Sequence, residues 1–96
     1  MGDVAMAIDN KLRQRFAPAR LAVEDESSKH HGHAGWREAG ETHFKVEIVS
    51  AVFDGLDRVA RQRLVYAALK AELDAGLHAL AITTLTPAED AGRVAS

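Results

Sequence analysis

The sequence predicts an α+β fold in which three strands form one mixed sheet and the helices pack on one face of it. Two patterns favour this class: strict apolar alternation over residues 43–49, and helical apolar spacing over about 3–16 and 58–75. The expected order is helix, strand, strand, helix, strand. Because the 96 residues contain no internal repeat or linker, we expect a single domain over 1–96, with an ordered core over about 3–87.

The first helix is expected over residues 3–16. Its apolar side chains recur every four residues and form one stripe: Val4, Ile8, Leu12 and Phe16. Asp3 can cap the start of the helix. Pro18 ends it, because the residue before a proline is pushed out of the helical region.

Two strands follow, over residues 20–26 and 43–49, and they form an extended hairpin. In the second strand Phe44, Val46 and Ile48 share one face, whereas Lys45 and Glu47 share the other. One face of this strand is therefore expected to be buried. The strands are separated by a long loop, residues 27–42, and a loop of this length in a small domain is more often functional than idle.

The second half of the chain is expected to supply a long helix and a third strand. After a turn over 50–56, with room for one short helical turn, Asp57 caps a helix over about 58–75 and Gly76 ends it. Its main apolar stripe is expected to consist of Val59, Val65, Tyr66, Leu69 and Leu73.

Residues 77–85 form the third strand. Both of its faces carry apolar or small side chains, which is typical of a strand covered on both sides. Thr86 and Pro87 end this strand, and residues 88–96 are expected to be frayed or to form a short helix.

Composition excludes several classes of function. The chain has no cysteine, so it offers neither disulfides nor thiolate ligands, and this composition is compatible with the cytoplasm. A formal net charge of −2 argues against attraction of the whole molecule to nucleic acid or to an anionic membrane. No apolar run is long enough to span a bilayer. No catalytic constellation is present, so we expect no enzyme, and a zinc store or a hydrolase ranks last.

Histidines are concentrated in one region: four of the five lie between residues 30 and 43. His30, His31 and His33 fall in the long loop and could adapt to a metal, whereas His78 stands alone at the start of the third strand. The alternative is a solvated loop and a strand histidine held by a backbone hydrogen bond. The spacing matches no standard zinc motif.

A second group of candidates is basic. A local basic surface could be formed by Lys45, Arg58, Arg61, Arg63 and Lys70. The alternative is that these side chains are the solvated sides of a strand and a helix, which is the commoner case. A continuous strip from Lys45 to Lys70 would favour DNA, whereas pairing of these cations with Glu47, Glu72 and Asp74 would not.

An ordered set of motifs resembles the BolA family over about residues 5–90. The matching stretches in the first half are Asp25–Ser27, Lys29–His30, Gly40–Val46 and Ile48–Ser50. Those in the second half are Phe53–Leu56, Arg61–Tyr66, Leu69, Glu72–Leu73, His78–Leu80 and Thr86–Glu89. Gln62 departs from the pattern, because many members have histidine between the two arginines, and no role is assigned to it.

The resemblance implies a fold similar to class II KH domains. It also implies a protein that pairs with a monothiol glutaredoxin and shares a [2Fe–2S] cluster with it, in iron sensing, cluster trafficking or redox regulation. The histidine typical of the family falls on His78, and its companion ligand comes from the loop, with His33 the best match and His30 or His31 as substitutes. The partner would supply thiolates, one of them from glutathione.

Some members of the family act as DNA-binding transcription regulators of morphology and stress response. The resemblance therefore implies an alternative function, in which the long helix and the turn before it bind DNA through the basic residues named above. We expect a cytoplasmic protein without membrane contact, which is a monomer alone and a heterodimer with its partner.

Overall fold

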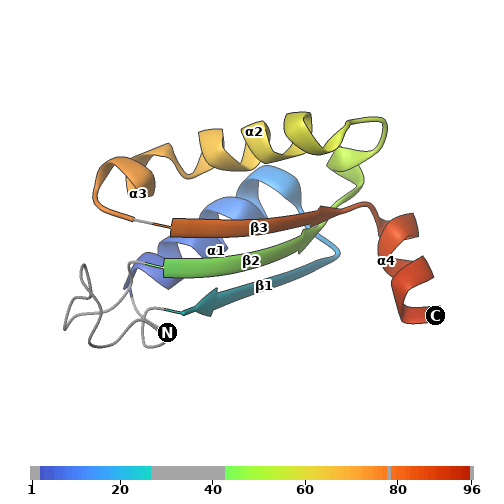
Figure 1. Ribbon diagram of the computed structural model, residues 1–96, viewed down its shortest axis with the longest axis horizontal. Helices are drawn as coiled ribbons and strands as arrows, with labels where there is room; N and C mark the ends of the chain where they lie inside the picture. Colours follow the sequence, from blue (N-terminus) through green and yellow to red (C-terminus); the bar gives the residue numbers. More distant parts are fainter. Residues whose placement is uncertain (1–2, 27–42, 78, 96) are drawn as a thin grey trace.

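The computed structural model describes residues 3–26, 43–77 and 79–95, with the side chains of 93–95 excepted. Its strands are β1 (Arg20–Asp25), β2 (His43–Val49) and β3 (Ala79–Leu85). Its helices are α1 (Asp3–Phe16), α2 (Arg58–Ala68), α3 (Lys70–Asp74) and α4 (Pro87–Ala95), with a short 3₁₀ helix, η2 (Ala51–Phe53), before α2. The predicted order, the helical turn and the short C-terminal helix are confirmed (Figure 1).

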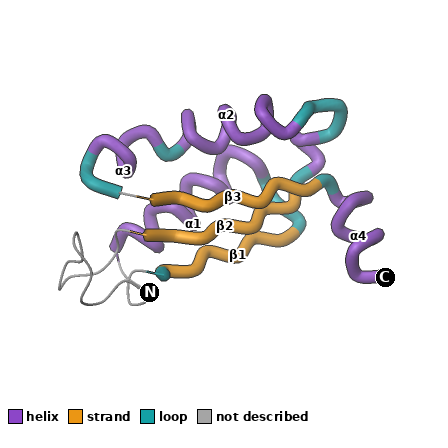
Figure 2. Tube along the Cα trace, in the orientation of Figure 1, coloured by secondary structure: helices purple, strands orange, loops and turns teal. Residues whose placement is uncertain are grey.

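The three strands form a mixed sheet in the order β1-β2-β3. β1 runs antiparallel to β2, with Val23 opposite Val46, and β3 runs parallel to β2, with Ile82 opposite Val46. The central strand is therefore β2, and β3 is an edge. α1 and α2 lie on the same side of this sheet, and α4 lies beyond the end of β3 (Figure 2).

The core lies between this sheet and the two helices. Phe44, Val46 and Ile48 are buried, as their alternation predicted, and they meet Ile8 and Leu12 of α1. The rings of Phe16 and Phe53 pack at a centroid distance of 5.4 Å, which joins the end of α1 to η2.

Buried Ser50 completes this junction between α1 and η2. Its Oγ donates to the carbonyl oxygen of Phe16 at 2.7 Å and accepts from the N–H of Val52. The hydroxyl thus satisfies an orphan carbonyl at the end of α1 and caps η2.

The long helix departs from prediction in two ways. It is broken at Leu69, whose N–H reaches the carbonyl oxygens of both Val65 and Tyr66 in a tight turn before α3. The expected apolar stripe is only partly the core face: Val65 and Leu69 are fully buried and Leu73 packs against the core, whereas Val59 and Tyr66 are 56% and 40% exposed. The buried positions of α2 and the turn after it are Val65, Ala68 and Leu69.

The prediction that β3 is covered on both faces is wrong. Ala79, Ala81 and Thr83 are exposed, whereas Leu80 and Ile82 are half-buried against the core. The reason is that α1 and α2 cover only one side of the sheet, so the small side chains of β3 belong to an open face. The helix cap at Asp57 is confirmed, since its side chain accepts from the N–H of Ala60 at 2.8 Å.

Candidate functional site

The four histidine candidates, His78, His33, His30 and His31, lie outside the described residues. The two residues that flank segment 27–42 are in contact, because the N–H of Glu26 donates to the carbonyl oxygen of His43 at 2.8 Å. His43 in turn is the register partner of Ala79, the first residue of β3. The chain therefore leaves and re-enters the described core beside the start of β3.

Arg61 is part of the packed structure and not of a free basic surface. Its side chain is only 12% exposed and takes a core-facing position one turn before Val65. The Nε–H donates to the carbonyl oxygen of Leu56 at 2.8 Å, and Nη1 donates to Oε1 of Glu89 at 2.7 Å. Such a guanidinium has few donors left for a phosphate.

The other basic candidates divide between two surfaces. Lys45 is exposed, and because side chains alternate along β2 it lies on the face opposite the buried Phe44 and Val46. Lys70 pairs with Asp74 at 2.7 Å, and this contact raises the pKa of Lys70. Arg58 and Arg63 are exposed on α2 and make no ion pair with any residue that the structure describes. No continuous strip therefore joins Lys45 to Lys70.

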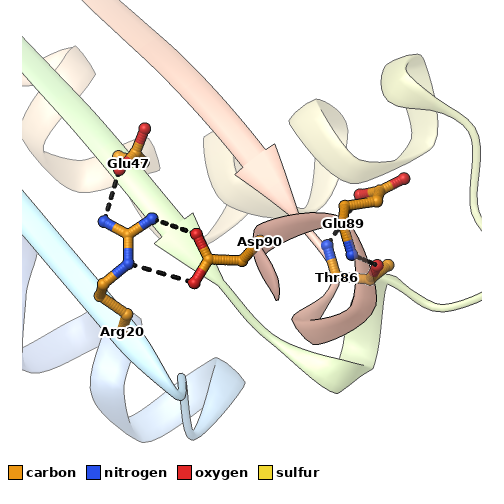
Figure 3. A network of polar contacts seen from close by, with 5 residues as sticks. All are labelled: Arg20, Glu47, Thr86, Glu89 and Asp90. Atoms are coloured by element: carbon orange, nitrogen blue, oxygen red, sulfur yellow. Dashed lines mark hydrogen bonds and ion pairs between the residues drawn. The ribbon is translucent and has the colours of Figure 1, made fainter. Parts of the chain in front are cut away.

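The acidic residues expected near these cations have other partners. Glu72 binds Lys11 of α1 at 2.7 Å, and Glu47 binds Arg20 of β1. Arg20 also holds Asp90 of α4 through two hydrogen bonds, the shorter at 2.6 Å (Figure 3). Asp90 and Glu47 together raise the pKa of Arg20.

The first turn of α4 is fixed by a reciprocal cap. The N–H of Thr86 donates to Oε1 of Glu89 at 2.8 Å, and the N–H of Glu89 donates to Oγ1 of Thr86 at 3.1 Å (Figure 3). Arg61, with the Thr86 N–H, lowers the pKa of Glu89 to about 2. Glu89 thus connects α4 to Arg61 of α2, and the adjacent Asp90 connects it to Arg20 of β1.

A hollow opens between α2 and the free edge of β3. Its larger part, of about 340 Å³, lies between Leu56, Arg61 and Glu89. The smaller part, of about 230 Å³, is lined by Arg58, Gln62 and residues 82–85. In the part of the chain that the structure describes, no three metal-ligating side chains come together. No helix among the described residues is long and apolar enough to cross a membrane.

Residues 12–89 match the sequence model of the family described as BolA-like protein. The chain belongs to the BolA family. It is 49% identical over 87 residues to a chloroplast protein named BOLA1 of Arabidopsis thaliana, an alignment that covers 88% of this chain and 54% of that protein. This BolA chain therefore spans about half the length of that relative.

A second relative contains the same unit within a longer chain. SufE-like protein 1 of Arabidopsis thaliana is 47% identical over 93 residues, which cover 93% of this chain and 25% of that protein. The solved BolA domain of SufE1 from Arabidopsis thaliana superposes with a TM-score of 0.83 at 47% identity, covering 93% of this chain and 98% of that domain. The α+β fold with its mixed sheet is thus the fold of BolA domains.

Two parts of the site region were missed from the sequence. The reciprocal cap of α4 had a signal, since Thr86 and Glu89 have the spacing of a capping box before a helix. The bridge from Arg20 to Glu47 and Asp90 had no signal in the sequence. Its partners are separated from Arg20 by 27 and by 70 positions along the chain.

Proposed function

We propose that this BolA chain is a non-enzymatic adaptor that pairs with a monothiol glutaredoxin and co-ligates a shared [2Fe–2S] cluster. His78 is one ligand from this chain, and His33 is the other, with His30 or His31 as substitutes. The partner contributes thiolates, including one from glutathione. The pairing would serve iron sensing, cluster trafficking or redox regulation.

Membership of the BolA family is the observation on which this proposal chiefly depends. The donor set of the chain agrees with it, because five histidines and no cysteine mean that this chain can offer imidazole but no thiolate to iron. When the cluster is bound, imidazole in place of thiolate on one iron raises its reduction potential. It also introduces a group that can be protonated.

The described structure is compatible with a site built from two distant segments. The contact between Glu26 and His43, and the pairing of His43 with Ala79, bring the two ends of segment 27–42 beside the first residue of β3. Binding residues are often carried by connecting segments that a packed scaffold positions.

Co-expression with a monothiol glutaredoxin tests the proposal. The purified complex should have the visible absorption and circular dichroism of a [2Fe–2S] cluster with mixed ligands, and His78→Ala should remove this spectrum or shorten the lifetime of the cluster. His43→Gln is the matched control, since it removes a histidine that is not a proposed ligand. Unchanged absorption, dichroism and lifetime in His78→Ala would refute the role of His78.

DNA binding is a second candidate, supported by one observation. Arg58 and Arg63 are exposed on α2, and neither makes an ion pair with the described residues. Two such cations could contact phosphates. The pairing of Arg61 and Lys70 with carboxylates, and the position of Lys45 on the other face, make this candidate weaker than the adaptor.

A further inference from the structure

The outer edge of β3 presents backbone groups away from the sheet. Leu85 faces β2, because its carbonyl oxygen accepts from the N–H of Ser50 at 3.0 Å. Successive residues of a strand direct their N–H and C=O groups alternately to its two sides. Leu80, Ile82 and Thr84 therefore direct theirs to the outer edge, where the described residues add no further strand to the sheet.

Side chains of α2 occupy the two ends of this edge. Nη1 of Arg61 donates to the carbonyl oxygen of Thr84, and the hydroxyl of Tyr66 donates to the carbonyl oxygen of Leu80, each at 3.4 Å. Between them, the N–H and C=O of Ile82 have no partner among the described residues. One residue of β3 thus keeps both of its edge groups available.

The smaller hollow lies directly beside Ile82. Its only charged lining residue is Arg58, whose guanidinium makes no ion pair within the described part of the chain. A space of about 230 Å³ lined by Ile82, whose edge N–H and C=O have no partner among the described residues, is suited to a short extended backbone, which lies about 4.8 Å from the strand it pairs with.

We propose that this edge docks an extended peptide segment of a protein partner, which pairs its backbone with Ile82 and places a carboxylate on Arg58. Strand addition of this kind takes affinity from main-chain hydrogen bonds and selectivity from neighbouring side chains. A nucleic-acid strand fits less well, because the adjoining part of the hollow has Asp57 and Glu89 beside Arg58 and Arg61 and therefore offers a chain of phosphates no net positive charge. The site requires neither the cluster nor His78.

Amide NMR of the whole chain tests the proposal. In the free protein the Ile82 amide should exchange with solvent faster than that of Thr83, which faces β2. The probe is a blocked hexapeptide of alternating valine and threonine with one glutamate, compared with its lysine counterpart. The glutamate peptide should shift and slow the Ile82 amide and should bind about threefold more tightly, the effect expected of an exposed ion pair.

Matched variants distinguish docking of the peptide at this edge from non-specific charge attraction between the peptide and α2. Arg58→Glu should reverse the preference so that the lysine peptide binds more tightly, whereas Arg63→Glu, on the same helix but outside the hollow, should preserve it. Methylation of the peptide's central amides should abolish binding. The proposal is overturned if the Ile82 amide is unaffected by millimolar peptide, if Arg63→Glu acts like Arg58→Glu, or if a single-stranded oligonucleotide shifts the same amides at lower concentration.

Discussion

Val46 lies at the centre of the sheet, between Val23 of β1 and Ile82 of β3, and its side chain is fully buried. Val46→Asp should lower the free energy of unfolding by about 3 kcal/mol or more, because it places an unpaired charge in the core. Val52→Asp is the control: this valine is 48% exposed, and the change should cost no more than about 0.5 kcal/mol. Equal midpoints of urea unfolding for the two variants would contradict the register of β2.

Glu89 predicts a dependence of stability on acid. Its pKa is lowered to about 2 from an ordinary 4.5, chiefly by Arg61, so the ionised form is favoured in the folded state. The stabilisation is therefore fully present above pH 4.5 and is lost as the pH falls toward 2. The gap in Tm between the wild type and Glu89→Gln should be largest at neutral pH and should shrink through that range.

An uncharged variant on the same helix serves as the control for this titration. Ala91 is exposed on α4, so Ala91→Gln adds an amide without removing a carboxylate. Its Tm difference from the wild type should stay constant over the same range. A gap for Glu89→Gln that is also independent of pH would mean that the ion pair with Arg61 does not stabilise the fold.

Elements with a local pattern were predictable from the sequence. Alternation placed Phe44, Val46 and Ile48 in the core, and the four-residue spacing in α1 identified Ile8 and Leu12, because each pattern depends only on backbone period. The face of the long helix was only partly predicted: Val65 and Leu69 are buried as expected, but Arg61 occupies a core-facing position while Val59 is exposed. Two partners make this arginine compatible with burial: the carbonyl oxygen of Leu56, in the turn before the helix, and the carboxylate of Glu89, which is distant in sequence. Apolar periodicity reveals neither.

The candidate site was less predictable than the fold. The ligand roles of His78 and His33 come from the family resemblance, and these residues lie outside the described part of the chain, so both roles stay predictions. For the basic residues, the pairing of Lys70 with Asp74 has the four-residue spacing of a helix, but only the folded arrangement separates Lys45 from α2. The edge of β3 becomes visible only once the strand order is known.

The surface of α2 allows a test of DNA binding at the level of one element. If DNA binds this helix, affinity should fall steeply with salt, and Arg58→Ala and Arg63→Ala should each lower the slope of log K against log salt by about one unit. Lys45→Ala, on the opposite side of the sheet, should leave the slope unchanged. Fluorescence anisotropy with a labelled duplex measures it, and an affinity that does not change with salt would exclude a role for these arginines.

At the scale of the whole molecule, the described core has two different ends. At one end α4 is tied to β1 and α2 through Asp90 and Glu89. At the other end Glu26, His43 and Ala79 meet, where the chain enters and leaves segment 27–42.

The most direct test is the nitrogen ligation of the cluster in the complex. This chain is labelled with ¹⁵N-histidine, assembled with an unlabelled monothiol glutaredoxin and glutathione, and reduced by one electron for pulsed EPR. The adaptor proposal predicts a strong ¹⁵N hyperfine coupling to the cluster, which is lost or altered in His78→Ala and retained in His43→Gln. A paramagnetic cluster without ¹⁵N coupling, or with the same coupling in His78→Ala, would contradict it.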